Sequence, residues 1–425
     1  MAKPDSKYRT RLVDAWLAEL LSQLPAVMLV GPRAAGKTTT ARRWVASAVR
    51  LDRAAEATAF ESDPDAALRD LPEPVLLDEW QAVPGVLGAV KRAVDEDSRP
   101  GRFLLAGSIQ APVERAMWPG TGRVVRVPMY PMAIREQVGQ VSGGTFFERI
   151  ERGEDLRVPV DSPDLLGYVE LALQGGFPDA VLRHRGSSAP AWLRSYVDDL
   201  LSRDLAALGG ERRSTGGLRR YFEAYTLASA TVAEAKTIYD AAGVSKVTAV
   251  AYEELLERLL VAEAMPAWHS NRLKRLVHQP KRYLIDAGLL GAVLRVDARG
   301  AMRDGLLLGR LLETFVAAQL RVELAGSVAQ PRLYHLRTER GRHEVDFLAE
   351  LGGGRVIGIE VKAKGGPGAS DARHLAWLRD EIGERFVAGV VLHTGPHVYE
   401  LSERIVAAPI STMWMEVPRR PTGDE

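Results

Sequence analysis

A phosphate-binding pattern stands near the start of the chain. Residues 31–38 read Gly-Pro-Arg-Ala-Ala-Gly-Lys-Thr, between an apolar run and helix-forming residues. Glycines let successive backbone N–H groups turn into one concavity, and the new helix adds its positive end. In this pattern the lysine reaches the β- and γ-phosphates and the threonine hydroxyl ligates Mg²⁺. We therefore expect ATP with Mg²⁺ to bind through Gly31, Pro32, Arg33, Ala34, Ala35, Gly36, Lys37, Thr38 and Thr39.

Two acids follow the next apolar run, which begins at Pro74 and ends in Asp78 and Glu79. Apolar strands often end in solvated acids, but this pair lies downstream of a phosphate loop. A carboxylate there can hold the Mg²⁺ shell while the next one polarises the attacking water. We assign Asp78, together with Thr38, to the metal. We assign Glu79 to the general base, with Lys37 as a further catalytic residue.

Ser108 ends a third apolar run and is the last residue assigned to the ATP site. It can sense the γ-phosphate or orient the water, or it can be an ordinary strand end, and both readings stay open. Arg123 can contact phosphate, although a surface or capping role explains it more simply. Arg203 can serve as an arginine finger for a neighbouring subunit, although an intrachain ion pair is the simpler explanation.

The composition limits the classes of protein. A chain of 425 residues exceeds one ordinary core, so several domains are expected. Its net charge of +1 sets up no global field for nucleic acid or membranes. The absence of cysteine excludes disulfides, thiolate metal sites and cysteine nucleophiles. We see no membrane-spanning run and no signal peptide, so we expect a cytoplasmic protein without a membrane partner.

The middle of the chain predicts a helix-turn-helix followed by a hairpin. Helices are expected over 231–242 and 245–260, the second capped by Ser245, and strands over 260–266 and 283–285. This order is the outline of a winged helix. A DNA-binding domain would use Lys246 and Thr248 on the second helix and the basic residues of the hairpin loop, Arg272, Lys274, Arg275, Lys281 and Arg282. The alternative is a packing domain or lid.

The C-terminal part carries a second set of acids. Glu313 lies in a predicted helix over 306–324, Asp346 in a hairpin strand, and Glu360 and Lys362 two apart on a buried strand over 356–362. The four residues resemble the site of the PD-(D/E)XK nuclease superfamily. Such carboxylates hold Mg²⁺ beside a scissile phosphate, and the lysine steadies the attacking water. The alternative is a nuclease-like fold kept for binding or oligomerisation.

Nearly the whole chain resembles one family. Residues 24–136 resemble the ATPase core of a bacterial and archaeal AAA+-like P-loop family that carries a C-terminal domain of unknown function. The matching segments are Gly31–Thr38, Leu77–Gln81, Leu104–Ser108, Gly122-Arg123, Pro131 to Glu136, Gly175–Pro178, Arg203-Asp204 and Lys281–Leu289. The resemblance implies ATP binding and often a site completed by a second subunit, so a homo-oligomer is an open expectation.

These patterns predict an α/β chain with four parts. They are an AAA+-like P-loop ATPase domain over 1–139, a helical connection over 160–210, a winged helix over 211–292 and a nuclease-like domain over 300–415. We expect further helices over 7–23 and 39–49, loops over 50–73 and a strand over 124–128. The predicted function is a Mg²⁺-dependent ATPase acting on or with DNA, as in remodelling or branch migration. The alternatives are an ATP-gated metal-dependent DNA nuclease and a nucleotide-dependent signalling or defence switch with a protein partner.

Overall fold

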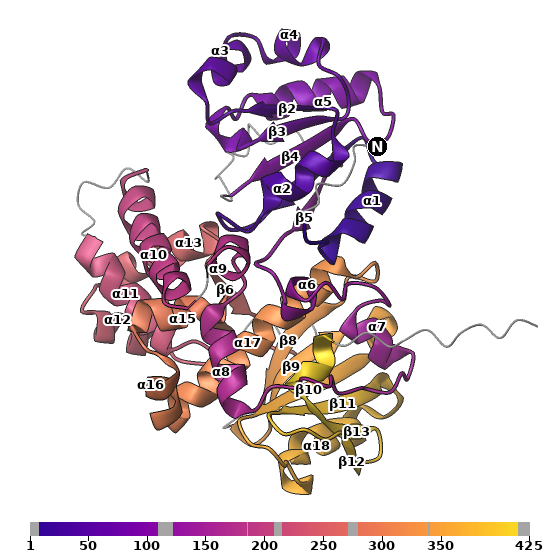
Figure 1. Ribbon diagram of the computed structural model, residues 1–425, viewed down its shortest axis with the longest axis vertical. Coiled ribbons are helices and arrows are strands. Elements are labelled where there is room, and N and C mark those ends of the chain that lie inside the picture. The colour runs from indigo at the N-terminus through magenta and orange to yellow at the C-terminus, as the bar shows by residue number, and fades with distance from the viewer. Residues whose placement is uncertain are drawn as a thin grey trace, which may run out of the picture. The chain divides into compact units, whose positions relative to one another are not determined.

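The computed structural model describes residues 8–108, 122–184, 186–207, 215–270, 279–338 and 341–414. The chain forms two compact units (Figure 1). The N-terminal unit runs to Pro131 and includes Leu255–Val261. The C-terminal unit comprises Met132–Glu254 and the residues from Ala262 onward. In the ranges given, every helix is too short or too polar to cross a membrane.

Five parallel strands form the sheet of the N-terminal unit, in the order β2-β3-β4-β1-β5. Three apolar runs form the buried centre, and their carboxyl ends meet at one edge of the sheet because the strands are parallel. The expected strand over 124–128 is confirmed as β5. The strands are β1 (Ala26–Val30), β2 (Ser47–Arg50), β3 (Val75–Asp78), β4 (Phe103–Gly107) and β5 (Val124–Pro128).

The helix expected over 39–49 is wrong beyond its first residues. Helix α2 (Lys37–Ala41) passes into a single 3-10 turn (Arg42–Trp44), and β2 follows. Val49 is buried there and pairs in register with Leu77 of β3. Pairing and burial against a neighbouring strand therefore override the helical preference of this segment.

The segment 50–73, expected to consist of loops, contains α3 (Ala54–Ser62) and α4 (Pro64–Arg69). Asp63 caps α4 because its Oδ1 accepts hydrogen bonds from the backbone N–H groups of the first turn at 3.0 and 3.1 Å. The unit is completed by α1 (Val13–Gln23), which begins later than expected, and by α5 (Val86–Glu96).

The first part of the C-terminal unit is mainly helical. Helices α11, α12 and α13, of which α13 belongs to this unit up to Glu254, precede the antiparallel pair β6–β7, and Thr231 forms an isolated bridge with Arg282 of β7. Ser245 caps α13 as expected, since its Oγ accepts from Thr248 N at 3.2 Å. The elements are α6 (Ile134–Gln137), α7 (Phe146–Glu151), α8 (Leu165–Gln174), α9 (Pro178–Leu182), α10 (Ser188–Ala207), α11 (Thr215–Leu227), α12 (Ala235–Ala242), α13 (Lys246–Arg258), β6 (Ala262–Met265), β7 (Lys281–Leu284), α15 (Ala287–Leu294) and α16 (Ala298–Arg303).

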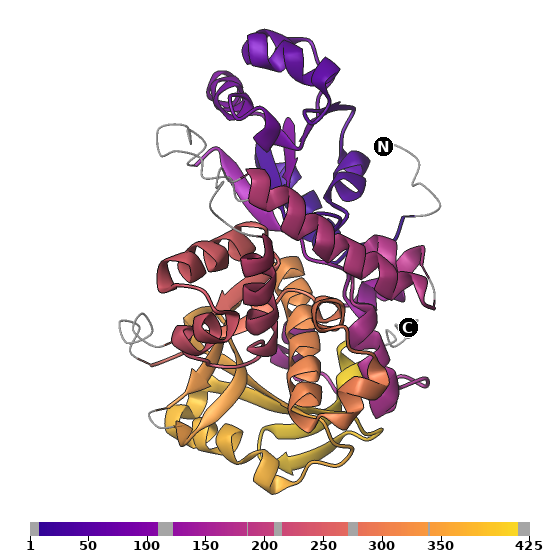
Figure 2. The same ribbon diagram turned by 90° about the vertical axis from the view of Figure 1, so that its left-hand side faces the viewer.

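A mixed sheet closes the C-terminal unit, in the order β12-β13-β11-β10-β9-β8. In both views α17 lies alongside this sheet, where it contacts β10, while α18 packs on β9, β10 and β11 (Figures 1 and 2). The predicted helix over 306–324 and strand over 356–362 are confirmed. The elements are α17 (Gly305–Gly326), β8 (Arg332–Arg337), β9 (Glu344–Glu350), β10 (Val356–Lys362), α18 (Arg373–Ile382), β11 (Phe386–His393), β12 (Tyr399–Ser402) and β13 (Ile405–Pro409).

Candidate functional site

The phosphate-loop pattern forms the turn between β1 and α2, and its last residues open the helix. Ala34 and Gly36 have φ values of 59° and 96°, so the chain makes a tight left-handed turn there. A Cβ atom at Gly31 would lie 1.9 Å from the carbonyl oxygen of Met129. Position 31 therefore admits glycine alone, because the loop passes directly against the backbone after β5.

Lys37 is folded onto this loop. Its Nζ donates to the carbonyl oxygens of Gly31 at 2.9 Å and Pro32 at 2.7 Å, and the residue is 5% exposed. Burial lowers the pKa of Lys37 to about 8, against the opposing attraction of Glu79 and Asp78. The ammonium group is thus held against the backbone at the beginning of the phosphate loop.

Thr38 and Asp78 meet as the sequence predicts. The Thr38 hydroxyl donates to Asp78 Oδ1 at 3.0 Å, and Asp78 is 2% exposed at the end of β3. Burial raises the pKa of Asp78, and the hydrogen bond from Thr38 opposes that shift. Hydroxyl and carboxylate oxygens are ligands of Mg²⁺, so this pair fits a magnesium ion.

Glu79 takes a left-handed backbone conformation, with φ of 52°, directly after β3. Its Oε2 accepts hydrogen bonds from Gln81 Nε2 and, at 3.3 Å, from Ser108 Oγ. The structure therefore brings Ser108 to the predicted base. The sequence patterns assign no role to Gln81, although it lies only two residues from Glu79.

Arg11 supports the phosphate loop and was also missed. It is 4% exposed, and its guanidinium donates to the carbonyl oxygens of Ala35 at 3.0 Å and Tyr130 at 2.7 Å. Ala35 lies between the two left-handed residues of the loop. Arg11 therefore fixes the loop to the segment that follows β5.

A hydrogen-bonded group beside Arg11 holds the end of α2 and the turn that follows it. The Tyr8 hydroxyl lies 3.0 Å from Asp14 Oδ1 and 2.9 Å from Thr40 Oγ1, and Arg43 pairs with Asp14 at 3.0 Å. The helix expected over 7–23 gives Tyr8 and Asp14 no role at the ATP site, whereas α1 begins only at Val13 and Tyr8 precedes it.

The acids predicted in the C-terminal unit also come together, but around a further residue. Lys281 Nζ of β7 lies 2.5 Å from Glu313 Oε1 and 3.1 Å from Asp346 Oδ1. Lys362 Nζ lies 2.7 Å from Glu360 Oε2. Lys281 was expected in the basic hairpin loop, but it is the first residue of β7 and is 2% exposed. That expectation is wrong because its partners come from α17 and β9, which are distant in the sequence.

Burial dominates the electrostatics of this cluster. It raises the pKa of Glu313 to about 7 and that of Glu360 to about 8, with Asp346 adding to both shifts. Burial would also raise the pKa of Asp346, but Lys281 and Lys362 hold it below its usual value. The attraction of Glu313 and Asp346 overcomes burial and raises the pKa of Lys281 well above its usual value.

The predicted DNA-contacting residues divide into two groups. On α13, Lys246 is exposed, whereas Thr248 is partly buried and bonded to Ser245. Arg282 is buried, and its Nε donates to Glu253 at 2.7 Å, so its expected role in a basic loop is wrong. Arg272, Lys274, Arg275 and the side chain of Arg203 lie outside the described residues. Arg123 forms an ion pair with Asp95 at 2.9 Å.

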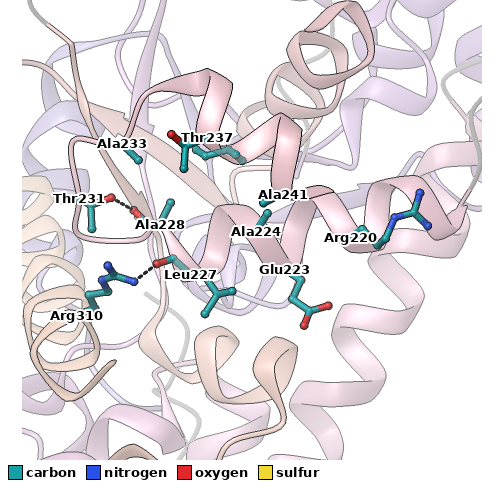
Figure 3. Close-up of a pocket in the computed structure, with 11 residues that line it drawn as sticks. Arg220, Glu223, Ala224, Leu227, Ala228, Thr231, Ala233, Thr237, Ala241 and Arg310 are labelled. Atoms are coloured by element: carbon teal, nitrogen blue, oxygen red, sulfur yellow. Dashed lines mark hydrogen bonds between the residues drawn. The ribbon is translucent and has the colours of Figure 1, made fainter. Parts of the chain in front are cut away.

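A cavity of about 450 Å³ lies between α11, α12 and α17 (Figure 3). Alanine and other small or apolar residues form much of its wall. Arg310 donates to the carbonyl oxygen of Leu227 at 2.5 Å, and Arg220 donates to that of Ala242 at 3.0 Å. Because both arginines already serve the protein backbone, we assign this cavity no ligand.

Family models divide the chain into three segments. The AAA domain matches residues 23–138, which confirms the expected P-loop ATPase core. A domain of unknown function (DUF8612) matches residues 166–300, and another (DUF4143) matches residues 308–413.

Two curated relatives match along most of the chain. They are Uncharacterized protein Rv2008c of Mycobacterium tuberculosis and Uncharacterized protein Mb2031c of Mycobacterium bovis. Each is 30% identical over 399 residues, which cover 93% of this chain and 82% of the relative. Among solved structures, a Walker-type ATPase of Pyrococcus abyssi overlaps 69% of this chain and 99% of its own, with 18% identity and a TM-score of 0.41. The chain therefore belongs to the same family as these two mycobacterial proteins, and its N-terminal part is an AAA-type P-loop ATPase domain.

Proposed function

We propose that this protein is a Mg²⁺-dependent ATPase that acts on or with DNA. The hydrogen bond between Thr38 and Asp78, 3.0 Å long at the end of the phosphate loop, carries the ATPase part of the proposal. These two residues would hold the Mg²⁺, which neutralises phosphate charge when bound. The loop from Gly31 to Thr39 would bind the phosphates with its backbone N–H groups.

The protein side chains then act on ATP and water. Lys37 leaves the carbonyl oxygens of the loop and pairs with the β- and γ-phosphates. Glu79 accepts a proton from the water that attacks the γ-phosphorus, and the β–γ bridging oxygen leaves with ADP. Gln81 and Ser108 hold the Glu79 carboxylate in place through their hydrogen bonds.

The DNA part of the proposal rests on the order of elements in the C-terminal unit. Three helices, an isolated bridge and an antiparallel strand pair follow one another from α11 to β7, as in a winged helix. Helix α13 would meet DNA with its exposed Lys246. ATP hydrolysis would move this domain relative to the ATPase core.

One observation favours a second candidate, a nucleotide-dependent switch with a protein partner. Val247 is 81% exposed and Val250 is also exposed on α13, next to Lys246. Exposed apolar side chains on one helix are typical of a protein contact and add nothing to phosphate binding.

The ATP turnover rate with and without single-stranded, duplex and branched DNA tests the proposal. We expect DNA to raise turnover, and Lys246→Ala to weaken that stimulation, with a steep loss of DNA affinity as salt increases. Val247→Ser is the matched variant, because it removes apolar surface and keeps the charge. Turnover that no DNA changes would favour the switch.

A homo-oligomer is also proposed, in which a second copy completes the ATP site. We test the homo-oligomer by measuring ATP turnover per chain at increasing protein concentration and the mass of the particle in solution. Turnover per chain should rise with concentration. A rate per chain that is independent of concentration, from a monomer, would contradict it.

A further inference from the structure

Lys281 stands at the centre of the acidic cluster in the C-terminal unit. Its ammonium lies 2.5 Å from Glu313 Oε1, 3.1 Å from Asp346 Oδ1 and 3.9 Å from Glu344 Oε1. A nuclease of the superfamily that these acids resemble would place a divalent cation among such carboxylates. Here the space between two of them holds a charged side chain of the protein itself.

Other groups of the protein donate hydrogen bonds to these carboxylates, although the buried Glu360 Oε1 receives none from any described residue. Asp346 Oδ2 accepts from the backbone N–H of Val361 at 3.0 Å, and Glu313 Oε1 accepts from the Tyr283 hydroxyl. Lys362 donates to Glu360. Across the part of the chain that the structure describes, no group of three or more His, Cys, Asp or Glu residues is arranged to hold a metal ion.

The charges explain why the ammonium excludes a metal. A buried ammonium must be paired, and Glu313 and Asp346 provide that pairing from two different elements. A divalent ion placed beside it would be repelled at short distance in a poorly solvated site. The residues therefore do not fit a resident metal ion while Lys281 is in place.

We propose that the Lys281 ammonium takes the place of the divalent cation between Glu313 and Asp346, so that this cluster is a metal-independent ion-pair centre. The centre joins β7, α17 and β9 into one unit. This cluster then supports no metal-dependent cleavage of phosphodiesters, and the nuclease alternative loses the site that was predicted for it. This inference is independent of the proposed ATPase function.

Binding of Mn²⁺ tests the proposal. Free Mn²⁺ is measured by electron paramagnetic resonance during titration of the full chain without nucleotide. Every protein carries Asp78→Asn, so that the phosphate-loop site cannot contribute. With Lys281 present, we expect Mn²⁺ binding to be the same whether or not the protein also carries Glu360→Gln or Asp346→Asn. In Lys281→Met we expect one new site per chain, at least about tenfold tighter than any other Mn²⁺ binding and lost when Asp346→Asn is added.

Two results would overturn the proposal. One is a Mn²⁺ site in the protein with Lys281 that Asp346→Asn or Glu360→Gln removes. The other is a folded Lys281→Met protein that gains no site, because its unpaired carboxylates should then attract the cation. If Lys281→Met fails to fold, Mn²⁺ binding of the protein with Lys281 is compared with and without Glu360→Gln, and this comparison still decides the question. Glu360→Gln should fold, because it keeps the shape of the side chain and burial already favours the neutral form of Glu360.

Discussion

The guanidinium of Arg11 donates a hydrogen bond of 3.0 Å to the carbonyl oxygen of Ala35 and so joins the segment before α1 to the phosphate loop. The same side chain holds Tyr130 after β5. A buried charged group that donates to two backbone carbonyl oxygens stabilises the conformation of the phosphate loop, which supplies one of them. The ATP site is thus supported by residues that precede its motif.

Arg11→Ala should weaken ATP binding. Loss of both hydrogen bonds lets the loop leave its left-handed turn, and we expect about tenfold lower affinity, or about 1.4 kcal/mol. A fluorescent ATP analogue measures this change. Arg43→Ala is the control, because Arg43 pairs with Asp14 but bonds no residue of the loop. Equal affinities in the Arg11→Ala and unmodified proteins, both folded, would contradict the supporting role.

ATP affinity should fall as the pH rises above about 8. Burial lowers the pKa of Lys37 to about 8, so the free protein loses this positive charge above that value. Phosphates favour the charged lysine, and binding at higher pH must therefore include uptake of a proton. We expect up to about tenfold weaker binding for each pH unit above 8.

Titration of the same ATP analogue at pH 7, 8 and 9 measures this dependence. Lys37→Arg is the matched variant, since a guanidinium stays charged throughout that range. If it binds at all, its affinity should not follow the same slope. A wild-type affinity that stays constant from pH 7 to 9 would refute the role of Lys37 charge.

Glu323→Ala should destabilise the C-terminal unit strongly. Glu323 lies buried between Arg135, 3.2 Å away, and the backbone N–H of Phe146 at 2.7 Å. Removal of one partner from a buried ion pair leaves an unpaired charge and costs about 3–5 kcal/mol. Urea denaturation measures the loss. Arg183→Ala, which breaks an exposed pair with Asp179, should change stability by less than about 1 kcal/mol.

Local patterns predicted the ATP site because its parts are local. The loop from Gly31 to Thr38 and the acids Asp78 and Glu79 follow strands whose apolar runs are legible in the sequence. Parallel pairing then brings Asp78 to Thr38. The support from Arg11 was not predictable in the same way, because the sequence around a single arginine before a helix does not indicate which backbone carbonyl groups it will bond.

Tertiary contacts explain the failures. Ser47–Arg50 is a strand only because β3 pairs with it, and the residues themselves permit a helix. Lys281 was expected in the basic hairpin loop because it follows Arg272, Lys274 and Arg275 in the sequence. Its burial depends on ion pairs with Glu313 and Asp346, which lie far from it in the sequence. The residues next to Lys281 therefore give no indication that its charge is compensated.

Glu79→Gln should keep ATP binding and stop turnover. The amide retains the shape of the side chain but cannot accept the proton of the attacking water, so we expect at least a hundredfold loss of kcat, within the usual range of about 10²–10⁴ for general bases. Steady-state phosphate release measures kcat, and the ATP analogue measures binding. Normal turnover in this variant would refute the assignment of the base.

Gln81→Ala should separate the position of the base from its chemistry. Gln81 Nε2 donates to Glu79 Oε2, and Ser108 donates to the same oxygen at 3.3 Å. Without Gln81 the carboxylate keeps Ser108 as a partner but gains freedom, so kcat should fall less than in Glu79→Gln while ATP affinity stays the same. Gln81→Glu is the informative partner variant, because it replaces the donor with a second carboxylate that would repel the Glu79 carboxylate from its position. Its kcat should therefore fall below that of Gln81→Ala while ATP affinity stays the same, and a kcat in both variants equal to that of the unmodified protein would contradict the positioning role of Gln81.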